Sequence, residues 1–259
     1  MLVAISAINL IWARGIFTVV FSTLLLLAFG YTPQDLTTIY QSDGLLYLAA
    51  TTTGSLGLLF MIRGLNESTL SQLSLFLILI SIFSLFGVSL TTEINEIYLL
   101  GVGIVFIAYL IHSSESIKSF TIQKGSVWFI LMVIAFTVTG FINWHLLKTH
   151  DAIISVWSQE VFLFLILSIV SLFDQKNYTK SLKLHWKTLA FFATLIIGAA
   201  YFGAIGLQVT DPLLLSVISL ISPIITAFLG KLILKEKWPI KFYLSFGLII
   251  VGIVLLLMK

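Results

Sequence analysis

Two ionisable residues lie deep inside long apolar stretches of the sequence. Glu160 stands about eight residues into the stretch 152–173, and Arg14 stands about ten residues into the stretch 4–29. If these stretches cross a bilayer, an ionised group at that depth costs roughly 3 kcal/mol, so it marks a candidate functional site. Glu160 could take up a proton and couple its movement to a transported cargo, and Arg14 could bind a carboxylate. Alternatively, the two side chains form a buried structural pair between the first and the sixth helix.

Tryptophan and glutamine side chains accompany both charges. Trp157 precedes Glu160 by three residues and shares its helix face, which would let an aromatic or cationic substrate stack beside a carboxylate. Trp12 lies two residues before Arg14 and Gln159 directly precedes Glu160, and we include both in the predicted substrate path. The alternative for the tryptophans is the interfacial aromatic belt of membrane proteins.

Two further apolar stretches carry polar or helix-breaking residues. Thr139 and Asn143 are four residues apart and would lie on one stripe of a helix, as one wall of a polar cavity. Ser222 and Pro223 lie inside another stretch, where proline bends or breaks a helix and frees carbonyl groups that could meet a substrate. A purely structural kink is the alternative at Pro223.

The sequence carries few residues or motifs typical of enzymes, and the missing ones exclude several classes of chemistry. The chain has no cysteine, so thiol nucleophiles, disulfides, thiolate metal sites and iron–sulfur clusters are excluded. No carboxylate or histidine pair has metal-ligand spacing, and no glycine-rich loop with a lysine could hold ATP phosphates. We therefore expect no catalytic residue, no metal and no cofactor. The net charge of +3 is too small and too scattered for a nucleic-acid partner.

The elements that must position these residues are membrane-spanning helices. Of the 259 residues, 59% are apolar and 10% are charged, and the mean hydropathy is +1.12. A spanning helix needs about 20 mostly apolar residues, and the connections between stretches are short, which favours neighbouring antiparallel helices. We predict an all-α polytopic membrane protein whose nine spans cover residues 4–29, 44–62, 67–90, 96–113, 126–147, 152–173, 186–207, 211–233 and 239–258.

The basic residues predict an orientation in the membrane. Eleven lysine and arginine residues fall on one side of the predicted bundle, whereas the other side holds only Lys148 and Lys259. Because basic residues accumulate on the cytoplasmic side, the start of the chain is predicted inside and Lys259 outside. The expected location is the plasma (inner) membrane of a prokaryote.

Weak self-similarity between the two halves predicts an internal repeat. The segment from Ile11 to Phe17 aligns with the segment from Val156 to Phe162 at an offset of 145 residues, and Glu93 aligns with Glu236 at an offset of 143. An odd number of helices between the copies would invert one copy relative to the other in the membrane. The repeats are expected at residues 1–113, with four helices, and 126–259, with five.

The last 50 residues carry the most specific pattern. Asp211-Pro212, Ser222-Pro223-Ile224, Gly230, Glu236, Gly247 and Gly252 follow one another in a helix, loop, helix frame. This pattern resembles the EamA-type half of the drug/metabolite transporter superfamily. The resemblance implies ten helices in two inverted five-helix repeats around a central cavity, and transport of small metabolites or drugs. The chain resembles nine of those ten helices, without the first helix of repeat one. We expect a truncated gene model, and the alternatives are a missed upstream start and a true nine-helix protein.

The expected function is therefore outward transport of a small organic metabolite, such as an amino acid or a drug, by alternating access. Proton coupling through Glu160 is a hypothesis within that function. Two alternatives remain: a carrier of lipid-linked sugars or nucleotide-sugars with the same fold, and an intramembrane lipid-modifying enzyme. A truncated, inactive copy is a third. The expected partners are the small-molecule substrate and the bilayer, and a homodimer remains open.

Overall fold

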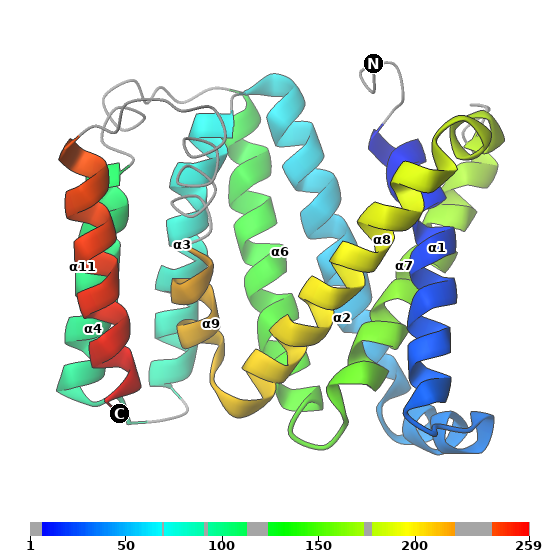
Figure 1. Cartoon of the computed structure of the whole chain (residues 1–259), viewed down its shortest axis with the longest axis horizontal. Coiled ribbons are helices and arrows are strands. Elements are labelled where there is room, and N and C mark those ends of the chain that lie inside the picture. Colours follow the sequence, from blue (N-terminus) through cyan, green and yellow to red (C-terminus); the bar gives the residue numbers. More distant parts are fainter. Residues whose placement is uncertain are drawn as a thin grey trace. The chain divides into compact units, whose positions relative to one another are not determined.

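A computed structural model describes residues 7–68, 70–90, 93–112, 124–173, 178–220 and 240–258. Within these ranges the chain forms nine helices and no strand, as predicted for an all-α protein. The helices are α1 (Ala7–Ala28), α2 (Pro33–Glu67), α3 (Leu70–Ser89), α4 (Glu96–His112), α6 (Gly125–Leu146), α7 (Ala152–Phe173), α8 (Tyr178–Val209), α9 (Pro212–Ser219) and α11 (Ile240–Leu257) (Figure 1).

Each described helix overlaps one predicted span, but two helices begin earlier than hydropathy indicates, and residues 221–233 of the eighth predicted span lie outside the described residues. α2 starts at Pro33, not near residue 44, because Thr32 and Asp35 cap its first turn reciprocally. The backbone N–H of Thr32 donates to Asp35 Oδ2 at 2.8 Å, and that of Asp35 donates to Thr32 Oγ1 at 3.3 Å. Hydropathy detects only the apolar part of a helix, so it misses such a polar first portion.

Five helical segments are long and apolar enough to cross a membrane among the residues searched. They lie in α1, α2, α6, α7 and α8. Shorter apolar helices cover Phe76–Ser89, Glu96–His112 and Tyr243–Leu256. In hydrocarbon every backbone N–H and C=O must be bonded within the protein, which explains why continuous apolar sequence folds here as helix.

The chain divides into two compact units. The first unit takes its described residues from Met1–Leu56 and Val138–Val209, and the second from Gly57–Thr137 and Thr210–Lys259. Each unit therefore combines residues from both predicted repeats. A repeat in sequence and a compact unit in space are different divisions, and the repeat boundaries stay a prediction.

In the first unit α1 packs against both α7 and α8, and α7 also packs against α8. Its buried cluster contains Leu26, Tyr47, Ala50, Leu146, Ile153 and Ile154. The amino-terminal part of α2 and the carboxyl-terminal part of α6 belong to the same unit. Two threonines, Thr53 and Thr139, join these two parts through a hydroxyl contact of 2.8 Å.

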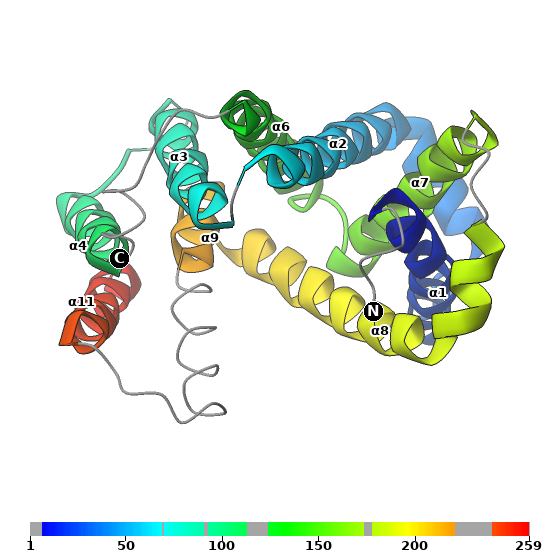
Figure 2. The same cartoon turned by 90° about the horizontal axis from the view of Figure 1, so that it is seen from above.

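In the second unit the main contact lies between α4 and α11, which run side by side (Figures 1 and 2). α3 packs against α9, whose first turn is capped by the buried carboxylate of Asp211. That carboxylate accepts the backbone N–H of Leu214 at 2.8 Å and the hydroxyl of Tyr98 at 3.1 Å. Asp211-Pro212 of the sequence pattern is thus a helix start, with the proline in the first turn, where its missing donor costs nothing.

Candidate functional site

The α1–α7 pair holds both charged residues that the sequence singles out. Both helices have 22 residues, and each end of α7 is offset from the same end of α1 by 145 residues. The start of α1 contacts the end of α7 through Trp12 and Ser168, and the end of α1 contacts the start of α7 through Thr23 and Trp157. The two helices are therefore antiparallel, as Figure 1 shows.

Arg14 and Glu160 form an ion pair between these helices. Arg14 Nη2 lies 3.2 Å from Glu160 Oε2 and 3.5 Å from Oε1. The side chains are only 17% and 10% exposed, so both charges are largely withdrawn from solvent. Such a pair neutralises each partner and lowers the cost of keeping either charge at this depth. The predicted contact between the first and the sixth helix is present.

The ion pair uses Nη2 of Arg14 and does not engage its Nε. Arg14 Nε is buried and makes no hydrogen bond with the described residues. A guanidinium presents donors in a planar fork that matches a carboxylate, and Nε belongs to one edge of that fork. Nε is thus a buried donor of the guanidinium that makes no hydrogen bond to Glu160.

Two indole hydrogen bonds flank the ion pair. The Trp12 indole N–H donates to Ser168 Oγ at 3.1 Å, and the Trp157 indole N–H donates to Thr23 Oγ1 at 2.9 Å. Trp12 and Trp157 are 145 residues apart, and so are Thr23 and Ser168. The two contacts are thus the same contact made in opposite directions by the two copies of the repeated segment.

These bonds change the role we expect of the tryptophans. Both indole N–H groups are engaged between helices, and the rings pack on neighbouring aromatic side chains. Sequence reasoning missed their partners, Thr23 and Ser168. The signal was present, because the offset of 145 that aligns Trp12 with Trp157 also aligns Thr23 with Ser168.

The remaining predicted residues of the first unit differ in how far their polar atoms are satisfied. Thr139 bonds the hydroxyl of Thr53, whereas Asn143 Oδ1 is buried without a hydrogen-bond partner in the described part of the chain. On the same helix an added Cβ at Gly140 would meet no described atom within 4 Å. Gln159 makes one long contact, from Nε2 to Ser155 Oγ at 3.5 Å. Asn143 and Arg14 therefore retain unused polar atoms that a ligand could satisfy.

Comparison with known proteins decides the family. The model of the EamA-like transporter family matches residues 123–258, which is more than half of the chain. The chain belongs to the EamA-like transporter family. It is accordingly an integral membrane protein and a transporter of the drug/metabolite superfamily.

A solved crystal structure supports the fold of this EamA-like transporter along nearly its whole length. The two align with a TM-score of 0.74 at 13% identity, covering 98% of this chain and 89% of the other. At that identity the likeness concerns the fold alone. No curated protein gives a significant match.

Two predicted residues of this EamA-like transporter, Ser222 and Pro223, lie outside the described residues. Among the described ones, no group of three or more histidine, aspartate or glutamate side chains could hold a metal ion.

A second polar cluster lies in the first unit, around the start of α2 and the connection between α6 and α7. His150 Nε2 lies 2.9 Å from Asp43 Oδ2, Tyr31 donates its hydroxyl to Asp151, and the Tyr40 hydroxyl lies 2.5 Å from Ser158 Oγ. Burial and the bond to Asp151 raise the pKa of Tyr31 to about 12, so its phenol stays a donor at neutral pH. Hydropathy gave no sign of this cluster, because its α2 members, Tyr40 and Asp43, lie on the polar first part of that helix.

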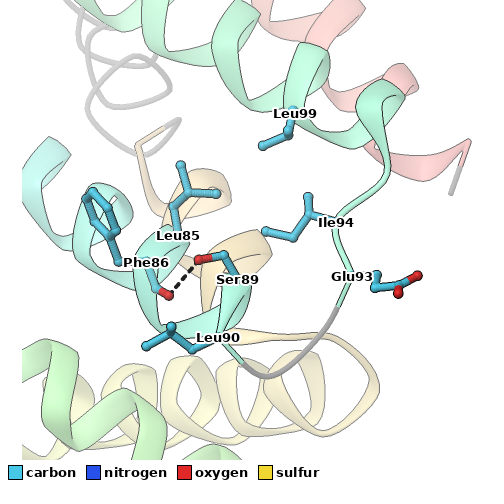
Figure 3. A pocket seen from close by; sticks show the side chains of 7 residues that line it. All are labelled: Leu85, Phe86, Ser89, Leu90, Glu93, Ile94 and Leu99. Atoms are coloured by element: carbon cyan, nitrogen blue, oxygen red, sulfur yellow. Dashed lines mark hydrogen bonds between the residues drawn. The ribbon is translucent and has the colours of Figure 1, made fainter.

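The second unit carries a surface groove of about 610 Å³ between the end of α3 and the start of α4. Figure 3 shows its lining, which is apolar apart from Ser89 and the exposed carboxylate of Glu93. The Ser89 hydroxyl is engaged with the Phe86 carbonyl at 2.8 Å. The predicted substrate-path residues do not line this groove.

Proposed function

We propose that this EamA-like transporter exports a small organic metabolite with a carboxylate group, and that the Arg14–Glu160 pair is its charged centre. The observation that carries the proposal is the buried ion pair itself, in which the buried Nε of Arg14 makes no hydrogen bond to the described residues. A buried charge pair costs desolvation free energy, and replacing such a pair by apolar residues often stabilises a protein. Retaining it in an apolar interface therefore points to a role beyond packing.

The proposed cycle exchanges one anion for another at Arg14. A substrate carboxylate that enters beside Nε competes with Glu160 for the guanidinium. Glu160, once displaced, is a carboxylate in an apolar interface and gains from taking up a proton. Loss of that proton restores the ion pair and releases the substrate, so proton and substrate bind together and leave together in this cycle.

Two inverted repeats would supply the alternating access that this cycle requires. Support comes from α1 and α7, which run antiparallel and make the same indole contact twice at one sequence offset. Transporters with inverted repeats change access largely by rocking one repeat against the other around a fixed site. The charged centre lies on helices from both predicted repeats.

The test is counterflow of a mixed amino-acid and metabolite pool into proteoliposomes, with and without a pH gradient. We expect a gradient-sensitive flux for the parent chain and a flux that no longer responds to the gradient for Glu160→Gln. Glu96→Gln removes an exposed carboxylate at the start of α4 and serves as the matched control. If Glu160→Gln transports as fast as the parent across the gradient, proton coupling through Glu160 is wrong.

Arg14→Gln tests the cargo class in the same assay. Loss of the guanidinium should raise the KM for carboxylate-bearing members of the pool about tenfold or more, because a charged hydrogen bond contributes roughly 1.5–3 kcal/mol. Uncharged members should be affected much less. Uniform loss across the pool would instead favour the structural interpretation of the ion pair.

A further inference from the structure

The two indole bonds of the α1–α7 pair lie at opposite ends of one interface between the predicted repeats. Trp12 and Thr23 are 11 residues apart on α1, or about 16 Å along the helix axis at 1.5 Å per residue. The ion pair lies between them, since Arg14 follows Trp12 and Glu160 follows Trp157. Any rocking of one repeat against the other around this centre must separate the helices at one end more than at the other.

We propose that Trp12–Ser168 and Trp157–Thr23 are a matched pair of bonds that position α1 on α7 and set which membrane face the charged centre opens to. This inference rests on the proposed alternating access. Breaking Trp12–Ser168 loosens the end where α1 begins, and breaking Trp157–Thr23 loosens the end where α1 finishes. Because the two bonds are equivalent, their loss shifts the equilibrium in opposite directions.

The surroundings of the two bonds support a balanced pair. Thr23 Oγ1 accepts the Trp157 indole while donating to the Val19 carbonyl at 2.7 Å, so its hydroxyl is held in the orientation that the indole needs. Three residues after Trp12, a Cβ on Gly15 would lie 3.0 Å from Phe164 Cδ2, so the two helices also pack closely beside the Trp12–Ser168 bond. A polar bond at each end of the interface is the arrangement in which tilting breaks one bond and keeps the other.

The absence of cysteine from the chain makes the test direct. A single reporter, Gln159→Cys, places a thiol next to Glu160, and a membrane-impermeant maleimide is applied to each face in right-side-out and inverted vesicles. A second single-cysteine chain, Gln34→Cys, marks the face where α1 ends, since Gln34 is exposed at the start of α2. The readout is the ratio of the labelling rates of Gln159→Cys from the two faces.

We expect Trp12→Phe to shift this ratio about three- to fivefold toward the face where α1 begins, and Trp157→Phe to shift it by a similar factor toward the other face. The size follows from the net worth of a single hydrogen bond. Phenylalanine keeps an aromatic ring at each position and removes the indole donor together with part of the ring. Ser168→Ala and Thr23→Val remove the acceptors and should reproduce the respective shifts, and they serve if a tryptophan variant folds poorly.

The double variant Trp12→Phe/Trp157→Phe separates positioning from general loosening. If the bonds balance each other, the labelling ratio returns to that of the parent, although the chain has lost both. Three results would overturn the inference. The two single variants could shift the labelling ratio in the same direction, or the double variant could shift it further than either single variant. The third is an unchanged labelling ratio in folded single variants.

Counterflow by the parent chain distinguishes failure of the indole-bond inference from failure of the proposed function. Flux by the parent with no opposite shifts overturns the indole-bond inference and leaves transport intact. No flux, together with a reporter thiol that reacts from neither face, overturns alternating access at this site and the inference with it.

Discussion

Two helix pairs of this protein have the same relation to the predicted repeat but are held together by different forces. The α1–α7 pair of the first unit is joined by an ion pair and two indole bonds. In the second unit, α4 and α11 approach so closely that a Cβ on Gly252 would lie 2.6 Å from Val105 Cγ2. Both pairs are antiparallel, since Gly101 meets Leu256 while Val105 meets Gly252.

This difference suggests that the glycine contacts keep α4 and α11 together, whereas the polar contacts between α1 and α7 can be exchanged. Glycines at a helix crossing gain dispersion contacts that are lost as soon as the backbones separate. Polar groups can exchange one partner for another, and a bound substrate or proton can supply the new partner. We therefore propose that α4–α11 supports the fold and that the proposed transport cycle acts at α1–α7.

The largest expected effect comes from removing one member of the ion pair. Arg14→Met leaves Glu160 as an uncompensated charge and should lower the free energy of unfolding by about 3 kcal/mol, measured by denaturant titration in detergent. Arg14→Met/Glu160→Met should regain most of that stability without regaining transport. If Arg14→Met is as stable as the parent, the ion pair contributes nothing to the α1–α7 interface, and the contrast with α4–α11 fails.

The glycine crossing gives the next largest effect. Gly252→Val should cost about 2 kcal/mol or more through overpacking against Val105. Gly247→Val is the matched control on the same helix, since a Cβ there would meet no described atom within 4 Å. Thermal melting of both variants provides the measurement, and equal melting temperatures would contradict the close approach.

A polar contact in the second unit sharpens the distinction between support and function. Tyr98 is buried and donates its hydroxyl to Asp211, the residue that caps α9. Tyr98→Phe should cost about 1 kcal/mol of stability and leave the counterflow rate unchanged. A fall in transport at full stability would show that polar contacts of the second unit also take part in the cycle.

The smallest effect is expected at the hydroxyl pair of the first unit. Thr53 and Thr139 are 2.8 Å apart, and a double-mutant cycle with Thr53→Val and Thr139→Val should give a coupling energy of about 0.6 kcal/mol. Coupling near 3 kcal/mol would place this contact beside the ion pair in importance and weaken the distinction between them.

Sequence alone predicted where the described helices lie, and it singled out the two charged residues that form the ion pair. Continuous apolar stretches have few folding options in a bilayer, so each of the nine described helices overlaps a predicted span. The starts of α2 and α8 were missed because hydropathy does not report polar helical turns. Glu160 and Arg14 stood out because charge at membrane depth is costly.

The sequence by itself thus determined the class of protein, the order of its described helical stretches and the offset of 145 residues between Trp12 and Trp157. Only the tertiary structure decided which polar atoms meet: that Arg14 contacts Glu160, that each indole bonds a hydroxyl on the other helix, and that Asn143 keeps an unused oxygen. The physical reason is that hydropathy is a property of each stretch, whereas a hydrogen bond depends on the register and direction of two helices far apart in the chain.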